Sequence, residues 1–103
     1  MIDVRLDKIE RRRLAGFNGN DERWGVVQRY TTDHSKEFPL LSSLNPWGDT
    51  TFREQEAKQL LEELKRLQIV FRSAPESTFL LEFEAMCEKV SDKEKVELVF
   101  LGD

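Results

Sequence analysis

The segment FREQEAKQLLEELKRLQ, residues 52–68, carries the clearest periodicity in the chain. Its apolar side chains recur at intervals of three and four residues, which places them on one stripe of an α-helix. The members of this stripe are Ala57, Leu60, Leu61, Leu64 and Leu67. Oppositely charged residues four apart on the remaining surface favour the same helix. The pattern therefore predicts a helix that begins near Phe52, ends near Gln68 and packs its leucine side against a core.

The sequence that follows predicts a second helix and a closing strand. The apolar side chains of residues 74–90 share one helical face, and Ser73 with Glu76 has the form of a capping box at the start of that helix. Between the two helices, IVF (69–71) is expected to leave the first helix as a short apolar segment. After an SDKEK turn, VELVFL (96–101) is almost continuously apolar, which is typical of a strand buried on both faces in the middle of a sheet.

The N-terminal third of the chain predicts strands. IDVRLD (2–7) alternates apolar and charged residues with the period of two of a half-buried strand. Residues 8–17 fit either a continued strand or a short helix begun by a capping box of Asp7 and Glu10. The strand is favoured because the NGND that follows is a hairpin-turn signal.

Two further features belong to this N-terminal part. RWGVVQRYTT (23–32) is rich in aromatic and β-branched residues and is expected to form the second arm of the hairpin. The basic run Arg11 to Arg13 is typical of an edge strand protected by charge from pairing with another chain.

The order strand, strand, helix, helix, strand predicts an α+β fold, namely a small, mainly antiparallel β-sheet with two amphipathic helices packed on one face. A length of 103 residues is that of one compact domain. We therefore expect residues 1–103 to form a single domain with a single core.

Charge and cysteine content limit the class of protein. The net charge of −4 divides into +2 over residues 1–36 and −6 over residues 37–103, which disfavours a nucleic-acid partner and suits a basic protein. A single cysteine forms no internal disulfide. No apolar run approaches the roughly 18 residues of a membrane span, and the N-terminus lacks the apolar stretch of a signal peptide. We expect a cytoplasmic protein that binds neither nucleic acid nor membrane.

Residues that carry chemistry are scarce. The one histidine, His34, lies in a polar stretch, and the one cysteine, Cys87, shares an apolar helix face, so they assemble no zinc site. The glycines form no phosphate-binding motif. The paired glutamates have the spacing of solvated helix faces rather than of a catalytic cleft. The sequence predicts no catalytic residue, no metal, no cofactor and no enzymatic activity.

The segment FPLLSSLNPWGDTTF, residues 38–52, has the features of a rigid helix entry. NPWG predicts a turn in which Pro46 fixes φ. The residues after it are suited to cap the leucine helix, since Asp and Thr side chains accept hydrogen bonds from free N–H groups. The candidate caps are Asp49, Thr50 and Thr51, the last in a capping box with Glu54.

Trp47 has no role in this helix entry. Tryptophan is the residue type most enriched at binding hot spots, so Trp47 is a candidate anchor for a partner, the alternative being that it folds back onto the core. The edge of the leucine helix beside it would complete an apolar centre with an acidic rim. The predicted partner-binding residues are Trp47, Phe52, Glu56 and Glu63.

The same segment resembles part of a group of small bacterial proteins. These carry F/Y-P-L-L, then P-x-G-D-T-x-F, then a leucine-rich helix, and the matching stretches here are FPLL, PWGDTTF and LLEELKRL. The terminal FLGD is similar to the way those proteins end. The resemblance covers about a third of the chain. It implies no established activity, but small proteins of this kind resemble immunity or antitoxin proteins.

Two function hypotheses follow. The first is a protein-binding domain, in its most specific form an immunity-type inhibitor that occludes a basic toxin domain through an acidic helix face. The alternative is a structural subunit that forms a homodimer through the apolar VELVFL strand or through Leu81, which falls on the polar side of the second helix.

Overall fold

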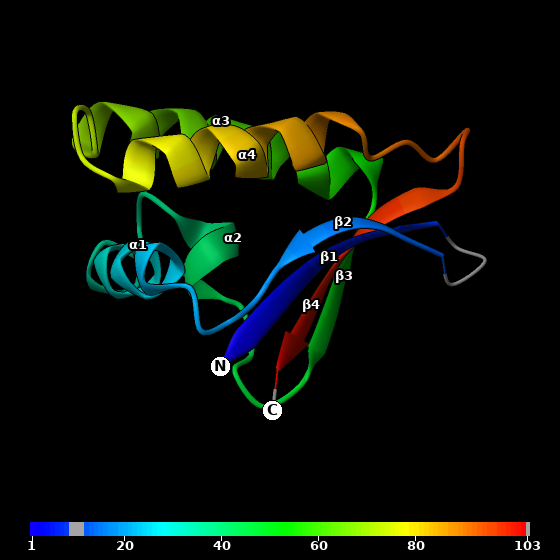
Figure 1. The fold of residues 1–103 in the computed structure, drawn as a ribbon, viewed down its shortest axis with the longest axis horizontal. Helices are drawn as coiled ribbons and strands as arrows, with labels where there is room; N and C mark the ends of the chain where they lie inside the picture. Colours follow the sequence, from blue (N-terminus) through cyan, green and yellow to red (C-terminus); the bar gives the residue numbers. More distant parts are fainter. Residues whose placement is uncertain (9–11, 103) are drawn as a thin grey trace.

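The computed structural model describes residues 1–8 and 12–102, which form a four-stranded sheet and four helices. In chain order the elements are β1 (Ile2–Lys8), β2 (Arg12–Phe17), α1 (Glu22–Asp33), α2 (Pro39–Ser42), β3 (Asp49–Phe52), α3 (Glu54–Val70), α4 (Glu76–Glu88) and β4 (Val96–Gly102). The strand order is β2-β1-β4-β3, and every neighbouring pair is antiparallel. α3 and α4 lie side by side over one face of the sheet, and α1 and α2 lie beside the sheet, beneath the ends of α3 and α4 that extend past it (Figure 1). The predicted α+β fold is confirmed, with two more helices than expected.

The closing strand β4 lies between β1 and β3, so its predicted place inside the sheet is confirmed. Val96, Leu98 and Phe100 are buried, whereas the side chains between them are half-buried. The expectation of burial on both faces is wrong, because the helices cover only one face of this sheet.

The predicted hairpin across NGND is wrong, since RWGVVQRYTT lies within helix α1. β1 and β2 pair with each other instead. At the start of α1 the carboxylate of Asp21 accepts a hydrogen bond from the Arg23 N–H (3.0 Å), which gives a partner to a donor that the helix leaves free. Trp24, Val27 and Thr31 then recur at helical spacing and are buried. The aromatic and β-branched residues of this segment therefore fill the core rather than pair a strand.

The strand interpretation of residues 8–17 is confirmed for Arg12–Phe17, which forms β2 at one edge of the sheet. This edge is the place expected for an arginine-rich strand. Asp7 lies in β1 and pairs with Arg5 (3.2 Å), so it does not cap a helix. Its predicted capping partner Glu10 lies outside the described residues.

Trp24 ties helix α1 to the first strand. Its fully buried ring lies 5.6 to 6.0 Å, between centroids, from the rings of Phe17, Phe79 and Phe83. Its Nε1 donates a hydrogen bond to the carbonyl oxygen of Ile2 at 2.8 Å, so the polar end of the indole is satisfied inside the core. The start of β1 is therefore held against α1.

The long helices end differently from the prediction. α3 continues through Ile69 and Val70, so IVF is not a separate segment. At the start of α4 the cap position is occupied by Pro75, without a side-chain capping bond. Ser73 has a positive φ of 67° and belongs to the turn between the helices, so its predicted capping role is wrong.

The three predicted caps of the leucine helix also lie elsewhere. Asp49, Thr50 and Thr51 belong to β3. This segment pairs with β4, which gives its backbone groups partners that a free helix entry would lack. The cap position of α3 falls to Arg53, whose N–H donates to the Glu56 carboxylate at 3.4 Å. None of the helices in residues 1–8 and 12–102 has both the length and the apolar character that a membrane crossing requires.

Candidate functional site

The turn Asn45–Gly48, called here the Trp47 turn, is held in one conformation by local hydrogen bonds. The Asn45 side-chain oxygen accepts from the Trp47 N–H at 2.9 Å, and the Gly48 N–H donates to the Asn45 carbonyl at 3.4 Å. Pro46 fixes φ between them. On the side of α2, Leu44 is buried and anchors the chain to the core.

The Trp47 turn is also fastened to the end of β4. The N–H of Gly102 donates to the Gly48 carbonyl at 3.1 Å. A Cβ at Gly102 would lie 2.6 Å from the carbonyl oxygen of Asn45 and 2.7 Å from that of Gly48, closer than real contacts allow. Glycine at this position therefore permits the close approach. The stretches NPWGD (45–49) and FLG (100–102), far apart in sequence, are direct neighbours in the fold.

Trp47 itself projects into solvent, with 80% of its surface exposed. The other tryptophan, Trp24, is fully buried in the core, whereas Trp47 contributes almost nothing to the core. Exposed tryptophans of this extent are unusual, because burying a large apolar side chain is favourable by roughly 1.5–3 kcal/mol. The alternative that Trp47 folds back on the core is wrong.

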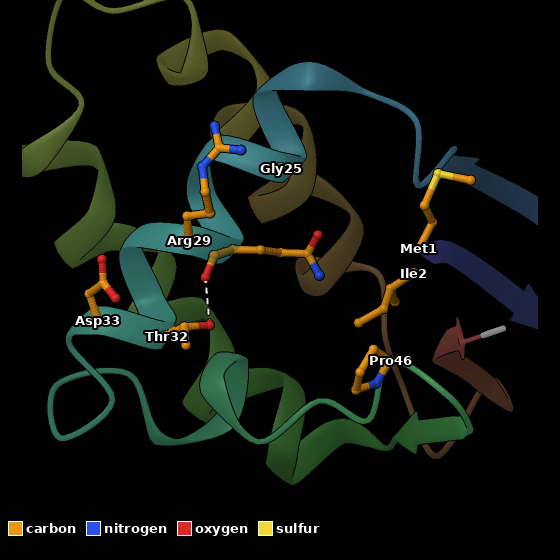
Figure 2. A pocket seen from close by; sticks show the side chains of 8 residues that line it. Met1, Ile2, Gly25, Arg29, Thr32, Asp33 and Pro46 are labelled. Carbon is orange, nitrogen blue, oxygen red and sulfur yellow. Dashed lines mark hydrogen bonds between the residues drawn. The ribbon is translucent and has the colours of Figure 1, made fainter.

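A groove of about 450 Å³ lies beside the Trp47 turn. Figure 2 shows one wall formed by helix α1 and the opposite wall by the start of β1 and by Pro46, the residue before Trp47. We call it the α1 groove. The helical wall consists of Gly25, Gln28, Arg29, Thr32 and Asp33, and the opposite wall of Met1, Ile2 and Pro46. One wall is thus polar and the other apolar.

Gly25 leaves the backbone of the helical wall uncovered by a side chain. A Cβ built there would meet no atom within 4 Å, so no packing contact within the described residues calls for glycine. In a helix, glycine costs about 1 kcal/mol relative to alanine. Without a side chain at this point, the α1 backbone can be approached closely from the groove.

Arg29 and Asp33 give the helical wall its charges. Both are exposed and stand one turn apart on α1 (Figure 2). Among the residues that the structure describes, neither forms an ion pair, in contrast to Arg5, Arg23 and Arg53. The groove therefore presents one free cation and one free carboxylate within its described lining.

The predicted partner-binding residues are not brought together. Phe52 is 6% exposed and packs edge-on against Phe100 at 5.0 Å between centroids. Glu56 is half-buried and bonded to the Arg53 N–H at 3.4 Å. Of the four, Trp47 alone stands fully out in solvent, so the predicted patch does not exist as a surface.

Glu63 is the predicted site residue placed furthest from expectation. It is 2% exposed, and its carboxylate accepts hydrogen bonds from the N–H groups of Leu40 (3.0 Å) and Leu41 (3.1 Å) at the start of α2. Burial raises the pKa of Glu63, although these two N–H groups and the charge of Arg66 act in the opposite direction. Glu63 therefore binds α2 to α3 and faces no partner.

The lone histidine and the lone cysteine are not part of the groove lining. His34 is exposed and stacks on Tyr30 with centroids 4.1 Å apart. Cys87 is buried, as expected, and this burial raises the pKa of its thiol to about 12, with the charges of Glu84 and Glu88 acting in the same direction. Within the described ranges, no cluster of three or more His, Cys, Asp or Glu residues is arranged to hold a metal ion.

The residues of the α1 groove were not found from the sequence, because the interpretation of 23–32 as a strand does not bring Arg29 within one helical turn of Asp33, which follows that stretch. The sequence did contain one signal for a helix here. Trp24, Val27 and Thr31 have helical spacing, and Asp21 before them is a favourable N-cap residue. No protein-family model, curated protein or solved structure matches this chain.

Proposed function

We propose that this chain is a protein-binding domain that engages its partner with Trp47 and the α1 groove. The observation that carries the proposal is the 80% exposure of Trp47 on a turn whose backbone is held by hydrogen bonds and by the close approach of Gly102. A preorganised turn loses little conformational entropy on binding. A partner that covers the indole would gain the burial free energy that the monomer leaves unused.

The chemistry of the groove supports binding rather than catalysis. Its described lining holds a single carboxylate, Asp33, and no histidine or cysteine. Paired acid–base groups, which hydrolytic chemistry needs, are therefore not part of this proposal. A volume of about 450 Å³ is within the range of ligand sites, and one apolar wall facing a polar one is the composition expected of a specific interface.

The test uses short random peptides displayed on phage and selected on immobilised wild-type protein. Peptides selected on the wild type should bind the Trp47→Ala variant about thirtyfold more weakly, the loss of affinity expected when a hot-spot residue is removed. In the complex, the Trp47 indole should be protected from acrylamide quenching. Ile69→Ala, which removes another exposed apolar side chain, is the matched control and should bind like the wild type.

Because Trp47 is exposed, Trp47→Ala should keep the wild-type melting temperature. Equal affinity of the selected peptides for wild type and Trp47→Ala, with unchanged quenching, would refute the proposal. Loss of stability in the variant would show instead that the indole serves the fold.

A second candidate surface is the outer side of α4. This helix contains four glutamates and no lysine or arginine, and Leu81 is 59% exposed on it. In a symmetric α4–α4 contact, Glu82 and Glu88 would face like charges, so the surface suits the basic partner of an immunity-type inhibitor better than a second copy. The VELVFL strand is not open to a copy through its edges, because β1 and β3 occupy both.

This second surface is tested with an amphipathic lysine–leucine helical peptide. Binding that is lost in Leu81→Asn and in Glu82→Lys/Glu88→Lys, but kept in Trp47→Ala, would favour the inhibitor role. Light scattering that reports a dimer dissociated by Leu81→Asn would favour the structural subunit.

A further inference from the structure

The charged side chains of the α1 groove have a spacing that an incoming chain can match. Arg29 and Asp33 are four residues apart on a helix, which is about 6 Å along its axis. In an extended chain, side chains two residues apart point the same way and lie roughly 6.6 Å from each other. An acidic and a basic side chain at positions i and i+2 of an extended segment therefore meet Arg29 and Asp33 together.

The bare α1 backbone at Gly25 and the two facing walls favour an extended occupant over a helical one. From Gly25 to Asp33 the helical wall is about 12 Å long. A helix with its side chains is roughly 10 Å in diameter. An extended chain is narrower, and the missing side chain at Gly25 lets it lie directly on α1.

The two walls dictate the remaining contacts. The polar wall faces the charged side of the segment, and Pro46 and the exposed Met1 side chain face its apolar side, since Ile2 is only 3% exposed (Figure 2). In an extended chain these two sides alternate with a period of two, so the residue between the charged pair turns toward the apolar wall and the Trp47 turn.

We propose that the α1 groove binds an extended peptide segment of the pattern acidic–apolar–basic, in which the acid pairs with Arg29, the base with Asp33 and the apolar residue with the wall beside Trp47. The pattern is equally satisfied by basic–apolar–acidic in the opposite chain direction. This inference rests on the proposed function and names the class of partner for the same site.

The experiment compares four displayed libraries that are random except for two positions two residues apart. These positions hold Asp and Lys, Lys and Asp, two Asp, or two Lys. On wild-type protein, the mixed pairs should be enriched over the like-charged pairs by roughly tenfold, the worth of exchanging an attraction for a repulsion at an exposed pair. The preference should weaken at high salt.

Charge reversal supplies the specific control. Arg29→Glu should shift the enrichment to two Lys, and Asp33→Lys should shift it to two Asp. The double variant Arg29→Glu/Asp33→Lys should restore the preference for mixed pairs. Arg72→Glu makes the same change in net charge at an exposed site on the α3–α4 turn and should leave the wild-type preference in place.

The outcomes separate this inference from the proposed function. Peptides that depend on Trp47 but show no charge preference in any variant would overturn the charge pattern and leave Trp47 binding standing. Mixed charges enriched four rather than two positions apart would indicate a helical occupant and overturn the extended one. Failure of every library to yield a binder would overturn the inference as well.

Discussion

Replacing Glu63 by alanine should loosen the attachment of α2 to α3. α2 is a four-residue helix with no side-chain cap of its own. The Glu63 carboxylate accepts from the N–H groups of Leu40 at 3.0 Å and Leu41 at 3.1 Å, and it reaches them from the middle of α3. Alanine removes both acceptors while leaving the rest of α3 unchanged.

The magnitude follows from what each group loses. The N–H of Leu41 belongs to a buried residue and that of Leu40 to a half-buried one. A buried donor without a partner costs about 1–3 kcal/mol. Part of this cost is offset, because the raised pKa of Glu63 means that burial disfavours its charged form. We expect a net loss of about 2 kcal/mol in the free energy of unfolding at neutral pH, and a melting temperature lower by roughly 10 °C.

Urea denaturation followed by circular dichroism measures this difference. Glu62→Ala is the matched control, since Glu62 is the exposed neighbour on the same helix and should leave the midpoint unchanged. Equal midpoints for Glu63→Ala and Glu62→Ala would refute the reasoning, because they would mean that the two N–H groups find other partners without cost.

The same carboxylate predicts a pH dependence with a defined sign. Burial raises the pKa of Glu63, so the folded protein holds this proton more tightly than the unfolded chain does. Its contribution to stability is therefore greatest below about pH 4.3, the pKa of an unfolded glutamate, and is lost as the pH rises through the folded pKa. As the pH rises from about 4 to neutrality, the urea midpoint of the wild type should fall relative to that of Glu63→Gln, which does not titrate at this position. A gain over this range would contradict the assignment.

Three further predictions concern single residues. Gly25→Ala should raise the free energy of unfolding by up to about 1 kcal/mol, measured by urea denaturation, and should weaken peptides selected on the α1 groove. Gly102→Ala should force the Trp47 turn off the end of β4, because the added Cβ meets backbone oxygens at 2.6 and 2.7 Å; we expect a lower melting temperature and altered acrylamide quenching of Trp47. Cys87, with its pKa raised to about 12 and its side chain buried, should resist alkylation by iodoacetamide at pH 8 until the protein is unfolded.

The parts of the fold that were predicted correctly are those in which one pattern dominates. The leucine stripe of α3, the alternation of β1 and the apolar run of β4 each determine an element without help from the rest of the chain. Failure came where two patterns compete. In α1, the aromatic and β-branched residues suggested a strand, whereas the decisive features were a cap at Asp21 and burial at helical spacing.

Of the candidate site, only Trp47 was predicted from the sequence. Trp47 was singled out because no local role accounted for it, and it proved to be the most exposed of the large apolar side chains described. Phe52 and Glu63 were assigned to the same surface by helical periodicity, which does not say what covers each face. α2 covers Glu63, and the pairing of β3 with β4 places Phe52 in the core. Both contacts join segments that are distant in sequence, so local patterns do not contain them.

Gly25 and Gly102 differ in a way that bears on function. At Gly102 a side chain would collide with the backbone of the Trp47 turn, so glycine is needed there for packing. At Gly25 a side chain would meet open space, and the helix would be more stable with alanine. A residue that lowers stability without a packing reason is one for which a binding role gives an explanation. Gly25 lines one wall of the α1 groove and Pro46, the residue before the exposed Trp47, lines the other. Two departures from the most stable arrangement, an open helix backbone and an exposed indole, therefore belong to the two segments that border this groove.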